Sequence, residues 1–203
     1  MNRRDALYRV SLLFGGTIVG AQVFLEGCGP DTQALSSSIF TPGNLRLLDE
    51  VGETILPTTA DSPGAKAAGI GAFMQTIVSD CYTAEERKVF LEGIVALDAR
   101  AQAGYQRAFL QLEAADRHAL LLELDAEAKA YEKTLAEVRA QRRTDPHADP
   151  VPAHYFTMMK QLTVWGYFSS EVGATQALRY VEAPGRYEGC IPYEPGQKAW
   201  ALS

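Results

Sequence analysis

Apolar residues recur every three or four positions through most of this chain, which is the spacing of one face of a helix. Six stretches show this spacing, and turn residues separate each from the next. No stretch of strand length alternates apolar with polar residues, and no internal repeat is visible. The pattern therefore predicts an all-α fold with a single helical domain of about five to seven helices.

Local signals place the starts of several predicted helices. Thr41 and Pro42 begin a helix that Pro57 ends, because a hydroxyl cap followed by proline is typical of a first turn. The run from Thr83 to Glu86 has the pattern of a capping box. Asp116 is expected to cap a longer helix. Between these, a helix is predicted with an apolar side of Ile70, Phe73, Ile77 and Val78.

In the last third of the chain, proline and glycine interrupt the predicted helices more often. The proline-rich segment 144–152 precedes a helix predicted over Tyr155 to Trp165, which Gly166 is expected to interrupt or end. Ser169 is expected to cap a short helix that runs to Tyr180. The remaining residues are rich in proline, glycine and aromatic side chains, so we expect an irregular aromatic C-terminal tail.

Composition limits the class of protein. Of 203 residues 47% are hydrophobic and 22% charged, which is ordinary for a globular domain and excludes a disordered, collagen-like or multi-span membrane protein. The chain has 19 basic and 25 acidic residues, a formal net charge of −6. An acidic chain with no basic block in its body is a poor binder of nucleic acid, since phosphates would repel it.

The first residues have the pattern of an export signal. Arg3 and Arg4 stand just before an apolar stretch over 10–25, which resembles a twin-arginine signal. The alternative is a retained N-terminal membrane helix. The stretch is about 16 residues long, short of the roughly 20 that a spanning helix needs, which favours the signal.

A cysteine follows this stretch. Leu25 lies three residues before Cys28 and Gly27 one before it, as in a bacterial lipobox, although Glu26 departs from that pattern. We therefore expect either lipidation at Cys28 or an incidental cysteine beside an ordinary cleavage site. The predicted organisation is a signal peptide over 1–27, a flexible tether over 28–40 and the helical domain over 41–203.

Export would place the two remaining cysteines in an oxidising compartment. Cys81 and Cys190 could then form a disulfide that closes a loop of about 108 residues, worth roughly 4 to 5 kcal/mol in the loop-entropy description. The alternative is two free thiols.

No catalytic, cofactor-binding or metal-binding residue is predicted. The chain lacks a glycine fingerprint for a dinucleotide and a phosphate-binding loop, and its three histidines have no ligand spacing. Glu53 is the acidic residue most expected to be buried, bonded to backbone or to a partner chain. A helical enzyme would need a cleft where His154, Tyr167 and Glu171 converge, and no motif supports one.

Three blocks of sequence together resemble the small subunit of membrane-bound gluconate 2-dehydrogenase, the "subunit 3" or gamma-subunit family. The blocks cover roughly residues 40 to 200. They are Glu53–Thr59 with Ser62–Ala65 and Ala68–Ile70, then Leu162–Gly173, and last Tyr180 with Pro184–Cys190 and Trp200.

The resemblance implies that this chain accompanies a catalytic subunit and carries no catalytic residues of its own. Such subunits accompany a large flavoprotein dehydrogenase of the glucose-methanol-choline type, which holds FAD and passes electrons to a cytochrome c subunit that carries haem c. The small subunit supplies the signal for the twin-arginine translocase, so the pair reaches the periplasm folded and becomes associated with the membrane. The substrate, whether a sugar, gluconate or a glycoside, is set by the large subunit.

The family blocks then predict a partner interface, because stable interfaces are enriched in aromatic residues. The candidates are Trp165, Tyr167, Tyr187, Tyr193 and Trp200, with core packing as the alternative for the first two. The competing hypothesis for the whole chain is a stand-alone, lipid-anchored periplasmic binding protein with no flavoprotein partner.

Overall fold

The computed structural model describes residues 40–142, 151–183, 185–186, 189–190 and 192–201. Within these ranges the all-α prediction is confirmed: the only strand-like pairing is an isolated bridge between Arg179 and Trp200. The helices are α3 (Pro42–Ile55), α4 (Ile70–Asp80), α5 (Ala84–Tyr105), α6 (Ala114–Arg142) and α7 (Tyr155–Ser169), with single turns at η1 (Ala65–Ala68), η2 (Phe109–Gln111) and the π-helical η3 (Gly173–Ala177).

Two predicted helix starts are confirmed at the level of their hydrogen bonds. The Thr41 side chain accepts a bond from the backbone N–H of Asn44 at 3.2 Å, so it caps α3. At the start of α5 the Thr83 hydroxyl accepts from the Glu86 N–H at 3.3 Å, and the Glu86 carboxylate accepts from the Thr83 N–H at 3.0 Å. This is the reciprocal capping box that the sequence predicts.

Two other predicted caps are displaced. α6 begins at Ala114, so Asp116 lies inside the first turn, where a negative charge suits the helix dipole, and is not the cap. Ser170 takes the place predicted for Ser169: it ends α7, and its hydroxyl accepts from the Gly173 N–H at 3.0 Å. The short helix that follows ends at Ala177 and does not reach Tyr180.

Gly166 neither ends nor interrupts α7, which continues to Ser169. A Cβ atom at position 166 would lie 2.5 Å from the ring of Phe73 on α4, closer than atoms can approach. The glycine therefore serves the packing of α4 against α7. Glycine inside a helix costs stability, but the close packing that it permits here outweighs that cost.

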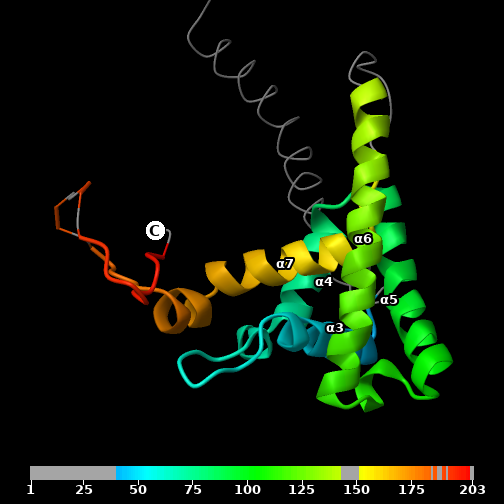
Figure 1. Ribbon diagram of the computed structural model, residues 1–203, viewed down its shortest axis with the longest axis horizontal. Coiled ribbons are helices and arrows are strands. Elements are labelled where there is room, and N and C mark those ends of the chain that lie inside the picture. Colours follow the sequence, from blue (N-terminus) through cyan, green and yellow to red (C-terminus); the bar gives the residue numbers. More distant parts are fainter. Residues whose placement is uncertain (1–39, 143–150, 184, 187–188, 191, 202–203) are drawn as a thin grey trace, which may run out of the picture. The chain divides into compact units, whose positions relative to one another are not determined.

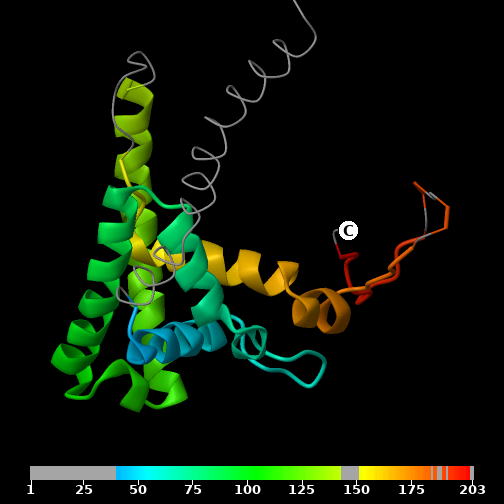
Figure 2. The same ribbon diagram turned by 180° about the vertical axis from the view of Figure 1, so that it is seen from behind.

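α7 is the central helix, in contact with α3, α4, α5 and α6. Figure 1 shows α7 crossing α6, and Figure 2 shows α3 and α4 beside it from behind. Its inward side chains meet fully buried residues of the surrounding helices. The core includes Leu48, Val51, Met74, Phe90, Leu97, Leu124, Met159 and Leu162.

The helical body begins one residue earlier than predicted. Phe40, assigned above to the end of the tether, is only 3% exposed. Its ring centroid lies 6.3 Å from that of Phe90 on α5. An aromatic side chain in this position anchors the start of α3 to the core.

Candidate functional site

The carboxylate of Glu53 organises the loop over 56–65, which follows α3. One carboxylate oxygen accepts from the backbone N–H of Thr58 at 2.9 Å and from its hydroxyl at 2.8 Å. The other accepts from the backbone N–H of Lys66 at 3.0 Å. A Cβ atom on Gly64 would lie 2.2 Å from the same carboxylate, so only glycine fits there. Glu53 therefore bonds backbone within its own chain, one of the two roles expected for it.

These bonds set the ionisation of Glu53. Burial raises its pKa, but the hydrogen bonds from Thr58 and from the Lys66 N–H favour the charged form and outweigh burial. The net effect is a pKa lowered from the ordinary value of 4.5. A group held ionised and fully bonded in this way organises structure and is a poor proton donor.

A second carboxylate, Glu50, ties this region to α6. It pairs with Lys66 of η1 and with Arg117 of α6. Burial raises the pKa of Glu50, whereas these two cations lower it, and the lowering prevails. α3, η1 and α6 are thus joined by charge as well as by apolar contact.

The ordered loop meets α7 through Tyr167. The phenol O–H of Tyr167 donates to the backbone carbonyl of Pro63, a residue 104 positions away in sequence. The side chain is 3% exposed. Tyr167 therefore holds the loop from inside the chain, which agrees with core packing, the alternative to a partner surface that was considered for it.

The same loop also meets the end of the chain. The ammonium group of Lys198 donates to the carbonyl of Asp61 at 3.2 Å and to the carbonyl of Gln176 in η3. The first and second family blocks thus meet at this loop through the bond from Tyr167 to Pro63, and Lys198 reaches the same loop from the C-terminal segment. Nothing in the spacing of the sequence signals these contacts, which is why Lys198 was not predicted.

A clasp of three residues, Arg179, Lys198 and Trp200, closes the C-terminal segment. The Arg179 N–H donates to the Ala199 carbonyl and the Ala201 N–H to the Arg179 carbonyl, each at 2.8 Å. The Arg179 guanidinium lies 4.0 Å from the centroid of the Trp200 ring, a cation–π contact. We call the described residues between these positions, 180–183, 185–186, 189–190 and 192–197, the arm.

Exposed apolar side chains gather on the arm, on the clasp and at the end of α7. Of eleven exposed large apolar residues in the described part of the chain, seven lie there: Val164, Trp165, Phe168, Tyr180, Val181, Tyr193 and Trp200. Among the predicted interface residues, Tyr193 is 77% exposed, Trp165 56% and Trp200 48%. Tyr187 lies outside the described residues.

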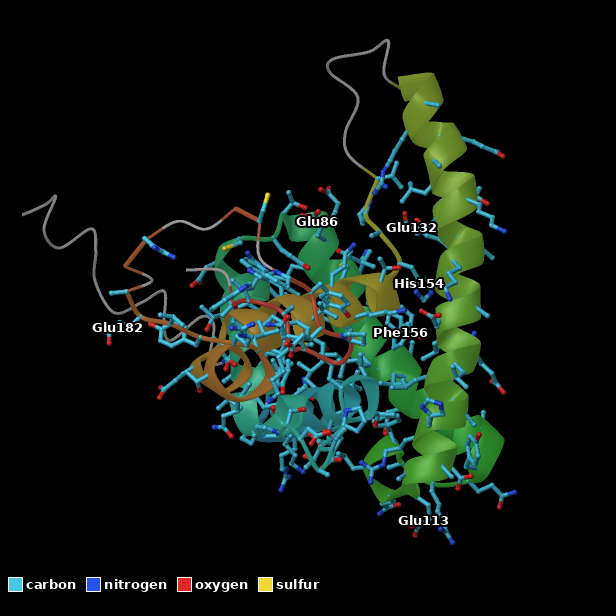
Figure 3. All side chains as sticks on the ribbon, turned by 60° about the vertical axis from the view of Figure 1, so that its left-hand side comes forward. Glu86, Glu113, Glu132, His154, Phe156 and Glu182 are labelled. Atoms are coloured by element: carbon cyan, nitrogen blue, oxygen red, sulfur yellow. The ribbon has the colours of Figure 1, made fainter. Side chains whose placement is uncertain are left out.

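His154 lies at the opposite end of α7. Its Nδ1 accepts from the Phe156 N–H at 3.2 Å, so it caps the helix, and its Nε2 lies 3.6 Å from the Glu127 carboxylate. Figure 3 shows His154 beside α6 and Glu182 of the arm far from it. About 20 Å of helix rise separates His154 from Tyr167. The two residues therefore do not converge with Glu171 in one cleft.

A groove with a volume of about 720 Å³ runs between α6 and α7. Trp165 forms one wall, with its ring edge-on to Phe73 at 5.3 Å between centroids. Lys129 and Lys160 lie at its rim and both pair with Asp125. The groove is open and its charges are largely paired, so it offers an apolar surface with no reactive group.

The remaining predictions concern the cysteines, the export signal, metal binding and membrane spans, and some of their residues lie outside the described ranges. Cys81 and Cys190 are both free and exposed, so the structure does not form the disulfide considered above. Arg3, Arg4 and Cys28 lie outside the described residues. Among the residues described, no group of three or more metal-ligating side chains is found. In the same part of the chain, no helix has the length and apolar character to cross a bilayer.

Comparison with known proteins gives one match. The family model for gluconate 2-dehydrogenase subunit 3 matches residues 42–185, which is well over half of the chain and includes every described helix. No curated protein and no solved structure matches.

Proposed function

Because the chain belongs to the gluconate 2-dehydrogenase subunit 3 family, we propose that it is the non-catalytic small subunit of an exported, flavin-dependent dehydrogenase complex. The family match over residues 42–185 carries this proposal. The geometry agrees with it, because the bond from Tyr167 to Pro63 joins the first two family blocks and aromatic side chains stay exposed.

In this proposal the chemistry belongs to the partner. A large flavoprotein of the glucose-methanol-choline type holds the FAD and oxidises a sugar, gluconate or a glycoside. A cytochrome c subunit with haem c takes the electrons. This chain stabilises the flavoprotein and contributes no catalytic residue.

The chain also directs export of the complex to the periplasm and its attachment to the membrane. Arg3 and Arg4 direct the folded pair to the twin-arginine translocase, which carries proteins with their cofactors already bound. Lipidation at Cys28 then holds the complex to the membrane on its periplasmic side. This arrangement needs no spanning helix in the small subunit.

Co-purification tests the proposal. The chain is expressed in its own host with a tag on a spacer after Ser203 and isolated from periplasmic and membrane fractions. We expect a roughly stoichiometric larger protein and the visible absorption of flavin, and a panel of sugars then identifies the substrate. A matched variant, Arg3→Lys with Arg4→Lys, should leave both proteins in the cytoplasm.

A colourless chain recovered alone would contradict the complex. It would instead favour the stand-alone binding protein, for which the groove beside Trp165 is the natural site. A complex that reaches the periplasm despite the arginine substitutions would contradict the export role while leaving the subunit role intact.

A further inference from the structure

We propose that the groove between α6 and α7 binds a single anionic amphiphile, a molecule with an anionic head and an apolar chain such as a fatty acid anion. The apolar chain lies along the floor of the groove, and the head lies among lysines at its rim. The groove is formed by this chain alone, so the inference does not depend on a catalytic partner. Its failure is therefore distinguishable from failure of the proposed function.

The floor of the groove is apolar. Ala128 of α6 lines it from one side, and Val164 and Trp165 of α7 line it from the other. Val164 is 41% exposed and Trp165 56%, so the described part of the chain leaves both side chains largely in water. The Trp165 ring lies edge-on to Phe73 of α4, which fixes its position from behind. An apolar chain laid along this floor would remove these side chains from water, which favours binding.

The rim of the groove is cationic. Lys129 of α6 and Lys160 of α7 both pair with Asp125, each at 2.6 Å, so one carboxylate faces two ammonium groups. Lys133 also lines the groove and has no acidic partner among the described residues. Its ammonium group is therefore available to an anion.

The acidic groups nearby do not cancel this charge. The second carboxylate that lines the groove, Glu132, already pairs with Arg139 at 3.4 Å. Four cationic side chains thus face two carboxylates here, although the whole chain has a formal net charge of −6. This local excess of positive charge complements an anionic head and disfavours a cationic one.

The size of the groove fits a small molecule better than a protein. Its volume of about 720 Å³ lies within the roughly 300 to 1,000 Å³ of ligand sites, which are mostly apolar and often lie between helices. Ten residues line it, whereas a stable protein interface uses about 20 to 30 residues on each side. A concave groove also suits one molecule better than the flat surface of a bilayer.

Calorimetry tests the chemistry of the ligand, on the protein as isolated from its host with any partner that it retains. Laurate is titrated below the concentration at which it forms micelles. Dodecyltrimethylammonium has a chain of the same length and a cationic head, and butyrate has the same head and a short chain. We expect laurate to bind, dodecyltrimethylammonium to bind at least about tenfold more weakly, and butyrate to give no measurable binding.

Photolabelling tests the location. A dodecanoate with a photoreactive diazirine near its methyl end is bound to the same protein and irradiated. After digestion, mass spectrometry should find the label on the peptides of α6 and α7 that contain Ala128 and Trp165. An excess of laurate should prevent the labelling.

Two matched pairs of variants test the floor and the rim. Val164→Asp places a carboxylate on the floor and should raise the Kd for laurate at least about tenfold, whereas Val95→Asp, at a 71% exposed position of α5, should not change it. Lys133→Gln should raise the Kd about threefold, and Lys88→Gln on α5 should leave it unchanged. All four positions are exposed, so the variants should unfold at the wild-type temperature.

Three results would overturn the inference. The first is an absence of label from α6 and α7, whether the amphiphile binds elsewhere or another chain covers the groove. The second is equal affinity for laurate and dodecyltrimethylammonium, which would show that the rim does not select charge. The third is binding to phosphatidylglycerol vesicles that Val164→Asp abolishes, without binding of free laurate, which would make a bilayer the occupant. Whether a flavoprotein co-purifies bears on the proposed function and on none of these results.

Discussion

At the scale of single residues, Glu53 has the most consequential role. Three hydrogen bonds from two residues converge on its carboxylate, and Gly64 passes close enough that no side chain fits there. Hydrogen bonds to a charged group are stronger than those between neutral groups. The acidic residue that sequence reasoning singled out therefore acts as the organiser of a loop.

Glu53→Ala should destabilise the chain by about 1 to 3 kcal/mol, because the N–H groups of Thr58 and Lys66 lose a charged acceptor. Chemical denaturation of the purified chain measures this. Glu137→Ala on the exposed face of α6 is the control and should change stability by less than about 0.5 kcal/mol. Equal effects of the two substitutions would contradict the account.

The lowered pKa of Glu53 gives stability a defined dependence on pH. Its folded-state pKa lies below the ordinary 4.5, because its hydrogen bonds outweigh burial. The stability that it contributes is therefore complete above pH 4.5 and is lost as the pH falls through the folded-state value.

Glu53→Gln should accordingly show a shallower loss of unfolding free energy than the wild type between about pH 5 and 3. Some slope should persist, because the pKa values of Glu50 and Asp125 are also lowered. Denaturation curves collected across this range make the comparison. Parallel pH profiles for the two proteins would be inconsistent with an ionised, bonded Glu53.

At the scale of elements, the packing of α4 on α7 depends on Gly166. Gly166→Ala should destabilise the chain by about 1 to 3 kcal/mol, because the new methyl group meets the Phe73 ring. Gly104 in the last turn of α5 has no atom within 4 Å of a Cβ position, so Gly104→Ala is the matched control. It should be neutral or stabilising by up to about 1 kcal/mol. Thermal unfolding compares them, and a neutral Gly166→Ala would refute the close approach.

The helices themselves could be predicted because their signals are local. Thr41 and the Thr83–Glu86 capping box fix two helix starts through contacts three residues away. Errors arose where a residue's role depends on distant neighbours. Gly166 was expected to break a helix by its propensity, yet its environment is the ring of Phe73. Asp116 is a residue type that often caps helices, but it lies inside the first turn of α6.

At the scale of the whole molecule, the contacts that assemble the candidate site are invisible to sequence reasoning. Tyr167 meets Pro63, and Lys198 meets Asp61, across more than one hundred positions. Apolar spacing carries no information about such pairs, so a partner surface and core packing both stayed open for Tyr167, and nothing indicated a role for Lys198. The aromatic arm was predictable from composition, but its closure by Arg179 and Trp200 was not.

The central claim is that this chain is the non-catalytic partner of a flavoprotein, and native mass spectrometry of the isolated complex tests it most directly. We predict one assembly that contains this chain and a larger one, and that on gas-phase dissociation the flavin mass stays with the larger chain. A small subunit that retains the flavin, or that is found only as a free chain or as copies of itself, would contradict the claim.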